Sequence, residues 1–415
     1  MSHARSIAEE LGNALPASDF DHHSPTFREA PHETLAALRS CCPVAHSDEH
    51  GGFWALLDYQ SVFDAARDDA LFNSYPSVGV PASGAPFPII PIESDPPLTQ
   101  KLRQVTLKAF SPGQAEALRP RTRRMAKEMV NAFIEKGQCD IIGELTTPLP
   151  AKLILHMLGF DDSKYLEWVH WVHSMVHDRT HDQEKSGVAV MEMFGEIYTN
   201  MTERREQGDL GDDLFGKILN GHIDDEPFDD TQILMYTVLM MLGGMDTTSG
   251  LTGNVLFALT ENSELREMLV NDPSRIESAT DELLRLYTPT LGLARTVSCE
   301  AEFHGANLQA GERAILMWSA ANRDPKMFQD PDSFDLNRSN SQKQMAFGVG
   351  IHRCLGSHLA RMMFQEMLGE ILERIPDFRV DGTPVRFQDA GEVWAMRELP
   401  IAFTSGPRVD VGDDA

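Results

Sequence analysis

Hydrophobic and polar residues alternate with a helical period along the middle of the chain. Between residues 115 and 285, segments such as "LRPRTRRMAKEMVNAFIEKG" and "SGVAVMEMFGEIYTNMTERREQG" repeat apolar residues three or four positions apart, which predicts amphipathic helices. Shorter runs around "GGFWALLD", "ELPIAF" and "LARTVSCEAEFHGANLQAGERAILMW" predict strands, the last as a small meander with turns at Gly305 and Gly311. The predicted fold class is mainly α with minor β (α+β).

Residues 231–260 form a long apolar run in which Asp246 is the only charged side chain. At about 1.5 Å per residue the run would make a helix about 45 Å long, buried on most sides. A membrane span is the alternative, but Gly243, Gly244 and Thr247 near Asp246 and the lack of basic flanks argue against it. The two glycines followed by Asp-Thr-Thr predict a widened or kinked turn. An acid beside a free hydroxyl suggests proton delivery, and the competing interpretation is a carboxylate that caps a broken helix.

The composition is that of a globular protein, with 42% hydrophobic and 24% charged residues among 415. The chain shows no internal repeat and no flexible linker. We therefore expect a monomer with a single domain over residues 1–415, an N-terminal arm at about 1–20 and a loose acidic tail at about 405–415. Five scattered cysteines indicate a reducing compartment, and the polar N-terminus differs from a secretory signal, so the predicted location is cytoplasmic.

Charge is spread unevenly along the chain. The net charge of -27 disfavours nonspecific binding to nucleic acid or to an anionic membrane. Residues 101–127 depart from this balance, because Glu116 is their only acidic residue among several lysines and arginines. Such a window is either a solvated helix face or a docking patch for an acidic partner.

A second charged motif lies in "ATDELLRLYTP". Glu282 and Arg285 are three positions apart, which places them on one helix face. Pairs at this spacing are often surface ion pairs of little consequence. The apolar neighbours Leu283, Leu284 and Leu286 indicate burial, and a buried pair requires further partners that satisfy both charges.

The most constrained segment is "FGVGIHRCLG". Gly348 and Gly350 permit backbone conformations that other residues avoid, and Phe347 can anchor the loop in a core. A helical pattern follows, so Cys354 lies just before a helix N-terminus, whose amides and dipole favour a thiolate. This setting suits a metal ligand or a nucleophile. Zinc is disfavoured because His352 is the one nearby partner, and the same histidine is badly placed to act as a base. An inert buried cysteine would not explain the glycine spacing.

"FGVGIHRCLG" resembles the haem-binding signature of the cytochrome P-450 family of haem-thiolate monooxygenases, whose pattern of Phe, Gly, His and Cys is highly specific. "LGGMDTT" is similar to the oxygen-activating turn of that family's central helix, "DELLR" to its Glu-x-x-Arg motif, and "DPPLTQKLRQVTLKAFSP" to its helix along the haem edge. "ANRDPKMFQDPDSFDLNR" resembles the segment that supplies a further arginine, here Arg338. The resemblance covers residues 20–404 and implies the cytochrome P-450 fold, a single large helical domain with small antiparallel sheets.

The resemblance implies that Cys354 is the axial thiolate ligand of the iron of haem b, a ligand that favours O–O cleavage. Other loop residues implied to contact the cofactor are Phe347 and Gly348. Three cations would bind the haem propionates: Arg103, Arg295 and His352. Bacterial members usually carry a histidine four residues before the arginine that corresponds to Arg103. The present chain has Thr99 at that position, which puts one propionate contact in doubt. The network implied beneath the haem consists of Glu282, Arg285 and Arg338.

By the same resemblance, Asp246 and Thr247 match the acid and alcohol pair that delivers protons during dioxygen activation. Haem-thiolate peroxygenases of this fold generally replace that pair, so its presence implies a monooxygenase with dioxygen as co-substrate. No flavin or iron–sulfur domain is visible, so electrons from NAD(P)H would arrive through a separate ferredoxin reductase and ferredoxin. The basic window then gains a docking role, and its candidate residues are Arg121, Arg123, Arg124 and Lys127.

The pocket segments implied by the resemblance are rich in aliphatic, Met, Pro and aromatic residues, which fits a compact apolar substrate held by shape. The overall pattern looks most similar to soluble bacterial members that hydroxylate small terpenoid or aromatic compounds. The candidate pocket residues are Met240, Gly243, Leu291 and Trp394. Two other classes stay open. A haem-thiolate ligand carrier or sensor without turnover is disfavoured by the acid and alcohol pair, and a cysteine hydrolase without haem would show no visible absorbance.

Overall fold

The structure is a computed structural model that describes residues 17–83 and 85–412. It is mainly helical, as the hydrophobic pattern predicts. The α-helices are α2 (Pro25–Glu29), α3 (Pro31–Cys41), α4 (Tyr59–Ala65), α5 (Leu98–Leu107), α6 (Pro112–Phe133), α7 (Pro148–Leu158), α8 (Tyr165–His173), α9 (Gln183–Gln207), α10 (Leu214–Leu219), α11 (Asp230–Glu261), α12 (Ser263–Asn271), α13 (Arg275–Leu286), α14 (Trp318–Ala321) and α15 (Ser357–Arg374).

Short strands form the minor β part. They are β1 (Val44–Ser47), β2 (Phe53–Leu56), β3 (Phe72–Asn73), β4 (Gln138–Asp140), β5 (His222–Ile223), β6 (Glu226–Pro227), β7 (Leu293–Val297), β8 (Ala301–Phe303), β9 (Ala306–Leu308), β10 (Arg313–Leu316), β11 (Arg379–Val380), β12 (Val385–Arg386), β13 (Met396–Glu398) and β14 (Pro400–Ala402). The largest sheet has the order β1-β2-β10-β7-β3. Its β2 and β10 run parallel, which corrects the expectation of antiparallel sheets throughout. Strands so distant in the chain need no tight turn between them and are free to pair in parallel.

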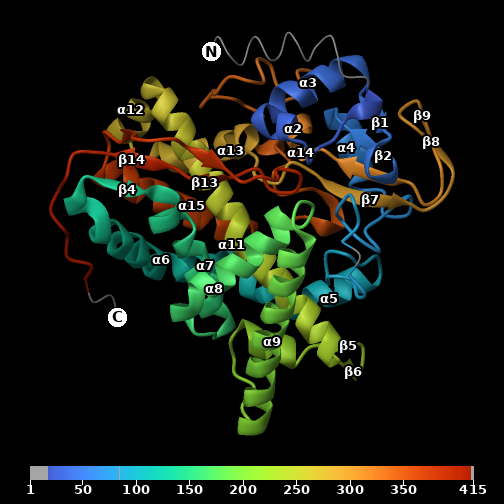
Figure 1. The fold of residues 1–415 in the computed structure, drawn as a ribbon, viewed down its shortest axis with the longest axis horizontal. Coiled ribbons are helices and arrows are strands. Elements are labelled where there is room, and N and C mark those ends of the chain that lie inside the picture. Colours follow the sequence, from blue (N-terminus) through green and yellow to red (C-terminus); the bar gives the residue numbers. More distant parts are fainter. Residues whose placement is uncertain (1–16, 84, 413–415) are drawn as a thin grey trace.

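The long helix α11 runs through the centre of the molecule, with α6 to α9 on one side and the strands β1, β2 and β7 with α3 and α4 on the other (Figure 1). It starts with a capping box, in which the Asp229 side chain accepts from the Gln232 amide and the Gln232 side chain accepts from the Asp229 amide. Gly244 lets α7 approach closely, because a Cβ atom at this position would lie 2.9 Å from the Ile154 side chain. Most of α11 is therefore buried among other helices, as predicted.

The expected widened or kinked turn in α11 is absent. The helix continues without a break from Asp230 to Glu261. The Thr247 hydroxyl stays within it and donates to the Gly243 carbonyl oxygen at 3.0 Å, the i−4 contact that a threonine side chain can make inside a helix. None of the helices within residues 17–83 and 85–412 combines enough length and hydropathy to span a bilayer.

Described residues near both ends of the chain contact the rest of the protein. Residues 1–16 and 413–415 lie outside the described part of the chain. Phe20, at the end of the predicted arm, is buried against Phe27 and Phe53. In the tail, the Asn131 side chain of α6 bonds both the amide and the carbonyl group of Val409. These bonds fix the tail to α6 at least as far as Val409.

Candidate functional site

The cysteine loop lies between the sheet region and helix α15. The Cys354 amide donates to the Phe347 carbonyl oxygen at 2.8 Å, which closes the loop. Gly350 has φ of 76°, and a Cβ atom there would lie 2.2 Å from the Ala66 carbonyl oxygen. Only glycine fits this position, since it combines a left-handed conformation with a close backbone contact. The loop is thereby fixed against the end of α4, and α15 begins three residues after the cysteine.

Cys354 is an exposed residue, and protein surrounds its thiol. Burial raises the pKa of the thiol, and the Gly356 amide and the charges of Arg103 and Arg353 lower it by less. The helix N-terminus is therefore not sufficient to ionise this cysteine, contrary to the expectation from its position. Because burial favours the protonated thiol, a metal cation bound beside the sulfur is the kind of partner that would ionise it.

Two arginines and a histidine lie close together near Cys354. They come from α5, β7 and the short 3-10 helix η9 (Gly350–His352), and they are Arg103, Arg295 and His352. Arg295 is only 4% exposed and bonds the Ala294 carbonyl oxygen, while Arg103 bonds the Arg353 carbonyl oxygen. Neither arginine forms an ion pair with a carboxylate of the described residues. Burial, together with the charges of Arg295 and Arg103, lowers the pKa of His352 to about 3.

Such a set fits a group that carries two carboxylates and a metal ion. A buried guanidinium normally has a counter-charge, because an unpaired buried cation costs several kcal/mol, roughly. The carboxylate that acts on Arg295, Asp95, accepts hydrogen bonds from the Ser74 and Tyr75 amides instead. Thr99 does not join the cations, because it is fully buried and its hydroxyl donates to the Ser94 carbonyl oxygen.

One face of α11 borders open space. Gly243 is exposed in the middle of a buried helix, and a Cβ atom there would meet no other atom within 4 Å. Met240 lies three residues before Gly243 and Thr247 four residues after it, so the three lie on one helix face. Met240 is buried and Thr247 is half-buried. The structure thus brings two of the four predicted pocket residues and the predicted alcohol together.

The other two predicted pocket residues lie elsewhere. Leu291 packs in the core beneath the main sheet, together with Phe53 and Ile315. The Trp394 ring packs under the Arg386 guanidinium and against His32. Its neighbours Val393 and Ala395 face α11 instead, since both approach Gly250. Alternation along an extended segment therefore turns Trp394 away from this helix.

Asp246 is buried and bonded by two histidines that the sequence did not single out. Its Oδ2 atom lies 2.8 Å from His177 Nε2, and its Oδ1 atom lies 3.5 Å from His173 Nε2. Burial would raise the pKa of Asp246, but His177 and His173 outweigh burial and hold that pKa well below its usual range. The interpretation of Asp246 as a helix cap is therefore wrong.

Two histidines four positions apart in "WVHWVHSMVHD" were the available signal for this contact. His173 ends α8, and His177 lies in the π-helical turn η7 (Ser174–Asp178). In a π turn, which is wider than a turn of α-helix, the side chains of residues i and i+4 point in nearly the same direction. Such turns are frequent at functional sites. The sequence pattern predicts neither the π turn nor its position opposite Asp246.

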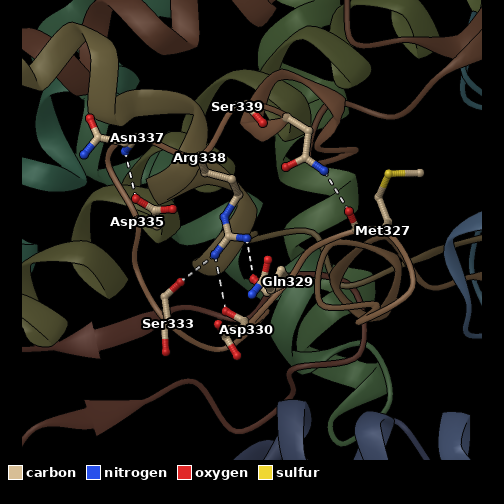
Figure 2. A pocket seen from close by; sticks show the side chains of 9 residues that line it. Met327, Gln329, Asp330, Ser333, Asp335, Asn337, Arg338 and Ser339 are labelled. Carbon is tan, nitrogen blue, oxygen red and sulfur yellow. Dashed lines mark hydrogen bonds between the residues drawn. The ribbon is translucent and has the colours of Figure 1, made fainter.

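The second charged motif forms a buried network. Arg285 donates two bonds to the Glu282 carboxylate, each 2.8 Å long, and Arg338 Nε donates a third at 2.9 Å. Burial would raise the pKa of Glu282, but the two arginines lower it overall. Figure 2 shows the rest of the Arg338 guanidinium bonding the carbonyl groups of its own loop, at Gln329, Asp330 and Ser333. The surface hollow around Arg338 is therefore organised by loop carbonyls, and it lacks the apolar lining of a substrate pocket.

The basic window forms α5 from Lys101 onward and most of α6, and part of its charge is paired within the protein. Arg119 and Arg123 both bond Glu366 of α15, at 2.6 and 2.8 Å. Arg121 is 3.9 Å from Asp162. The other two candidate docking residues, Arg124 and Lys127, lie on the same helix, which packs along α15. The predicted docking residues thus share a helix next to the one that follows Cys354.

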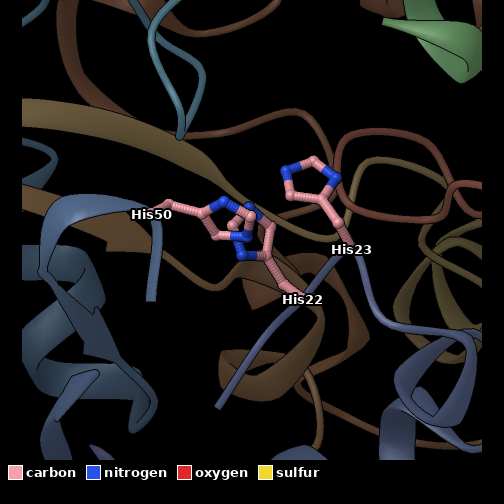
Figure 3. A group of neighbouring side chains, drawn as sticks. All are labelled: His22, His23 and His50. Carbon is pink, nitrogen blue, oxygen red and sulfur yellow. The ribbon is translucent and has the colours of Figure 1, made fainter. Parts of the chain in front are cut away.

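A further group of histidines lies near the N-terminal segment. Figure 3 shows the rings of His22, His23 and His50 gathered together. His23 Nδ1 bonds the Asp389 carboxylate at 2.7 Å and His23 Nε2 bonds the Val80 carbonyl oxygen at 2.6 Å. His50 Nε2 bonds Asp21. Both ring nitrogens of His23 are engaged in protein contacts, so this group is a hydrogen-bonded cluster.

Known proteins with similar sequence or structure are oxygen-incorporating oxidoreductases. The chain is 30% identical to steroid C26-monooxygenase of Mycolicibacterium smegmatis, over 86% of this chain and 89% of that protein. It is 26% identical to linalool 8-monooxygenase of Pseudomonas putida, over 87% and 93% of the two chains. The structure of Mycobacterium marinum cytochrome P450 CYP268A2 in complex with pseudoionone superposes with a TM-score of 0.83 at 26% identity, over 94% of this chain and all of that chain (100%).

These likenesses define the class as a monooxygenase with the fold described above. The family model described as "Cytochrome P450" matches residues 150–403, more than half of the chain. The chain therefore belongs to the cytochrome P450 family. Membership implies a haem iron, dioxygen, redox partners and a small substrate.

Gly350→Ala should destabilise the cysteine loop. The new Cβ atom would meet the Ala66 carbonyl oxygen, and a left-handed conformation of a residue other than glycine costs about 1–3 kcal/mol. We expect a lower midpoint of thermal unfolding, measured by circular dichroism. Gly356→Ala is the matched control, because its Cβ atom would lie at an ordinary 3.9 Å from Phe110 and its φ is -81°. Equal unfolding midpoints of the two variants would contradict the role given to Gly350.

Proposed function

We propose that the protein is a haem-thiolate monooxygenase that inserts one atom of dioxygen into a small apolar substrate. The observation that carries this proposal is that Arg103 lies near the Cys354 thiol and that Arg103 and Arg295 lie near His352, although neither arginine has a carboxylate partner among the described residues. Haem b fits this site chemically, since it offers an iron to the sulfur and two propionates to the cations. In this proposal Cys354 is the axial ligand, and the propionates are held by Arg103, Arg295 and His352.

When bound, the haem supplies the iron at which dioxygen is reduced and activated. The loop residues act by position: Gly350 fixes the loop against α4, and Phe347 and Gly348 form the part that would line the cofactor. The Gly356 amide donates to the Cys354 sulfur, and such bonds tune the electron density of a thiolate ligand. Glu282, Arg285 and Arg338 act as a structural network that holds the loop before the cysteine.

Asp246 and Thr247 are the proposed proton-delivery pair. The Thr247 hydroxyl lies on the open face of α11 and donates to the Gly243 carbonyl oxygen, so it can pass on a proton only when it exchanges this bond for another partner. Asp246 lies one residue earlier and points to the histidines. A positioned group that transfers protons typically contributes about 10²–10⁴-fold to the rate.

The face of α11 that carries Met240 and Gly243 supports an apolar substrate. Met240 and Gly243 present apolar or open surface there, which favours recognition by shape. The steroid and linalool monooxygenases named above, and the structure with bound pseudoionone, are similar proteins whose names or titles specify apolar molecules. We propose a terpenoid or an aromatic compound of similar polarity as substrate.

Electrons from NAD(P)H are proposed to arrive through a ferredoxin reductase and a ferredoxin. The docking surface would be the exposed side of α6, which packs along the helix that follows Cys354. Its proposed contacts are Arg121, Arg123, Arg124 and Lys127. Because Arg123 also bonds Glu366, its charge is shared between the protein and any acidic partner.

The proposed function is tested first by the absorption spectrum of the reduced protein exposed to carbon monoxide. We expect a strongly red-shifted Soret band in the wild type and its loss in Cys354→Ala, because only a thiolate ligand shifts the band in this way. Ser357→Ala, next to the loop on α15, should keep the band. A folded wild-type protein without a haem band would overturn the proposal, and a haem protein that binds apolar ligands without forming product would indicate a carrier or sensor.

Thr247→Ala should divert electrons from product to hydrogen peroxide. Loss of the hydroxyl removes the proposed proton donor on the open face of α11, so we expect the ratio of product to peroxide to fall by about tenfold or more. The measurement compares NAD(P)H consumed, product formed and peroxide released in a system with ferredoxin and its reductase. Thr248→Ala is the control on the buried side of the helix. Unchanged coupling in Thr247→Ala would contradict the role of Thr247.

Ferredoxin docking on α6 should depend steeply on salt. Exposed charges are screened within about 10 Å at 0.1 M ionic strength, so electron transfer should slow as salt increases. The double variant Arg121→Gln/Lys127→Gln should lower the rate of haem reduction by ferredoxin and flatten its salt dependence. Arg205→Gln on α9 serves as the control, since it removes one charge far from α15. A rate that is insensitive to salt and to the double variant would exclude this surface.

A further inference from the structure

Asp246 lies between two imidazole groups that differ in their surroundings. His177 is 2% exposed and lies 2.8 Å from one carboxylate oxygen, whereas His173 is 24% exposed and lies 3.5 Å from the other. The carboxylate therefore contacts one imidazole that is fully buried, His177, and one that solvent reaches, His173. A buried carboxylate of this kind needs such partners, because its desolvation is otherwise costly.

The hydrogen-bond partners of His177 determine which of its ring nitrogens carry a proton. Its Nε2 atom lies 2.8 Å from the Asp246 carboxylate and its Nδ1 atom lies 3.1 Å from the Asp389 carbonyl oxygen. An ionised carboxylate and a carbonyl group only accept hydrogen bonds, so both ring nitrogens of His177 must donate. A neutral imidazole has one N–H group and an imidazolium has two. His177 is therefore an imidazolium, and its raised pKa agrees with this assignment, since the charge of Asp246 and the two bonds outweigh burial.

His177 is also held in one orientation. Its ring stacks on Phe387, with centroids 3.7 Å apart and planes 3° from parallel. Asp389, whose carbonyl oxygen accepts from His177, is fixed in turn: its carboxylate accepts from His23 at 2.7 Å and from the Thr180 hydroxyl. Burial would raise the pKa of Asp389, but these bonds and the His23 charge lower it to about 2. The histidine cluster of Figure 3 thus supports the partner of His177.

His173 is held less tightly. Its ring meets Phe387 edge to face, at 4.7 Å between centroids, and its 3.5 Å separation from Asp246 is long for a hydrogen bond to a charged group. Phe387 contacts both imidazoles, which keeps them on the same side of the carboxylate. His173 can therefore exchange its proton with solvent, whereas His177 cannot do so without breaking two bonds.

We propose that His177 and His173 are positioning residues that govern proton supply to Asp246, an inference that rests on the proposed monooxygenase function. His177 keeps Asp246 ionised and oriented. His173 supplies the proton. The Nε2–H bond of the His173 imidazolium breaks and its electron pair stays on Nε2, while an O–H bond forms at Asp246 Oδ1. The carboxyl group then releases this proton towards Thr247, and His173 takes up a new proton from solvent.

The charge on His177 keeps the proton on Asp246 only briefly. Because the imidazolium stabilises the carboxylate, protonation of Asp246 is uphill, and the proton resides on His173 until it is consumed. Asp246 thus passes the proton on and does not hold it. The groups that face this relay are Asp246 on α11, His173 on α8, and the carbonyl group and carboxylate of Asp389, with His23 and His181 beside that carboxylate. Proton supply to Asp246 should fall when either imidazole is removed.

The first experiment measures product formation and its solvent isotope effect in three variants. His173→Gln and His177→Gln each remove an imidazole, and His170→Gln is the matched control, since His170 is exposed on the same helix α8. We expect product formation at saturating substrate to fall about tenfold or more in His173→Gln and His177→Gln. We also expect a larger solvent isotope effect in both variants. Wild-type values in both variants would overturn the proposal.

A second experiment has a readout other than activity. Because the pKa of His177 is raised in the folded state, its stabilisation is complete below the ordinary histidine pKa and is lost as pH rises through the raised value. The difference in thermal midpoint between wild type and His177→Gln should be largest at acidic pH, above the range where carboxylates titrate, and shrink towards alkaline pH. A difference that does not vary with pH would contradict the imidazolium. Should His177→Gln fail to fold, nitrogen-15 NMR of labelled histidine in the ferrous carbon monoxide form gives a separate readout. The contacts of His23 make it an imidazolium as well, so the measurement uses His23→Gln, which must still show a doubly protonated ring at neutral pH. Absence of that ring would overturn the proposal.

The same samples separate this inference from the proposed function. A wild-type and variant spectrum with the red-shifted carbon monoxide band, combined with unchanged proton-dependent kinetics, would overturn the histidine relay alone. Absence of that band in folded wild type would overturn the proposed haem-thiolate function itself.

Discussion

The free-energy cost of burying a charge decides how this protein is arranged. Within the described residues, buried carboxylates such as Glu282 and Asp246 have cationic partners at hydrogen-bond distance. An unpartnered charge would cost several kcal/mol, roughly, which is a large share of the stability of a folded domain. Arg103 and Arg295 have no carboxylate partner among the described residues; Arg103 lies near the Cys354 thiol, and both arginines lie near His352. In the function proposed above, a ligand that carries two carboxylates would supply the charge that these arginines lack.

The helical core holds these groups in place through a few close contacts. Gly244 brings α7 onto α11, and Gly350 brings the cysteine loop onto the end of α4. The loop is therefore fixed from the sheet side, while the helix that follows Cys354 packs on α6 and α11. Because the loop is packed on α4 and the helix after it is packed on α6 and α11, the core and not the loop itself fixes the position of the sulfur relative to α11.

Local motifs were predictable from the sequence, and contacts between distant segments were not. The cysteine loop and the pair of Glu282 and Arg285 are encoded within a few residues, so glycine positions and i+3 spacing identify them. The parallel pairing of β2 and β10 and the turning of Trp394 away from α11 depend on tertiary packing. The same holds for α11, where packing on all sides keeps straight a turn that helix propensity alone would weaken. The contact between His177 and Asp246 was missed because it requires a π turn, for which a single sequence gives no reliable pattern.

The two functional residues of α11 face different directions, and this separation has a mechanistic consequence. Successive residues of an α-helix are about 100° apart around its axis. Asp246 therefore points to His177 and His173, while Thr247 points to the open face beside Gly243. A carboxylate bonded to His177 is turned away from the hydroxyl, and one turned towards the hydroxyl loses the partner that makes its burial tolerable. In the mechanism we propose, transfer of a proton from Asp246 to Thr247 therefore includes a rotation of the Asp246 side chain, and the bond to His177 opposes that rotation.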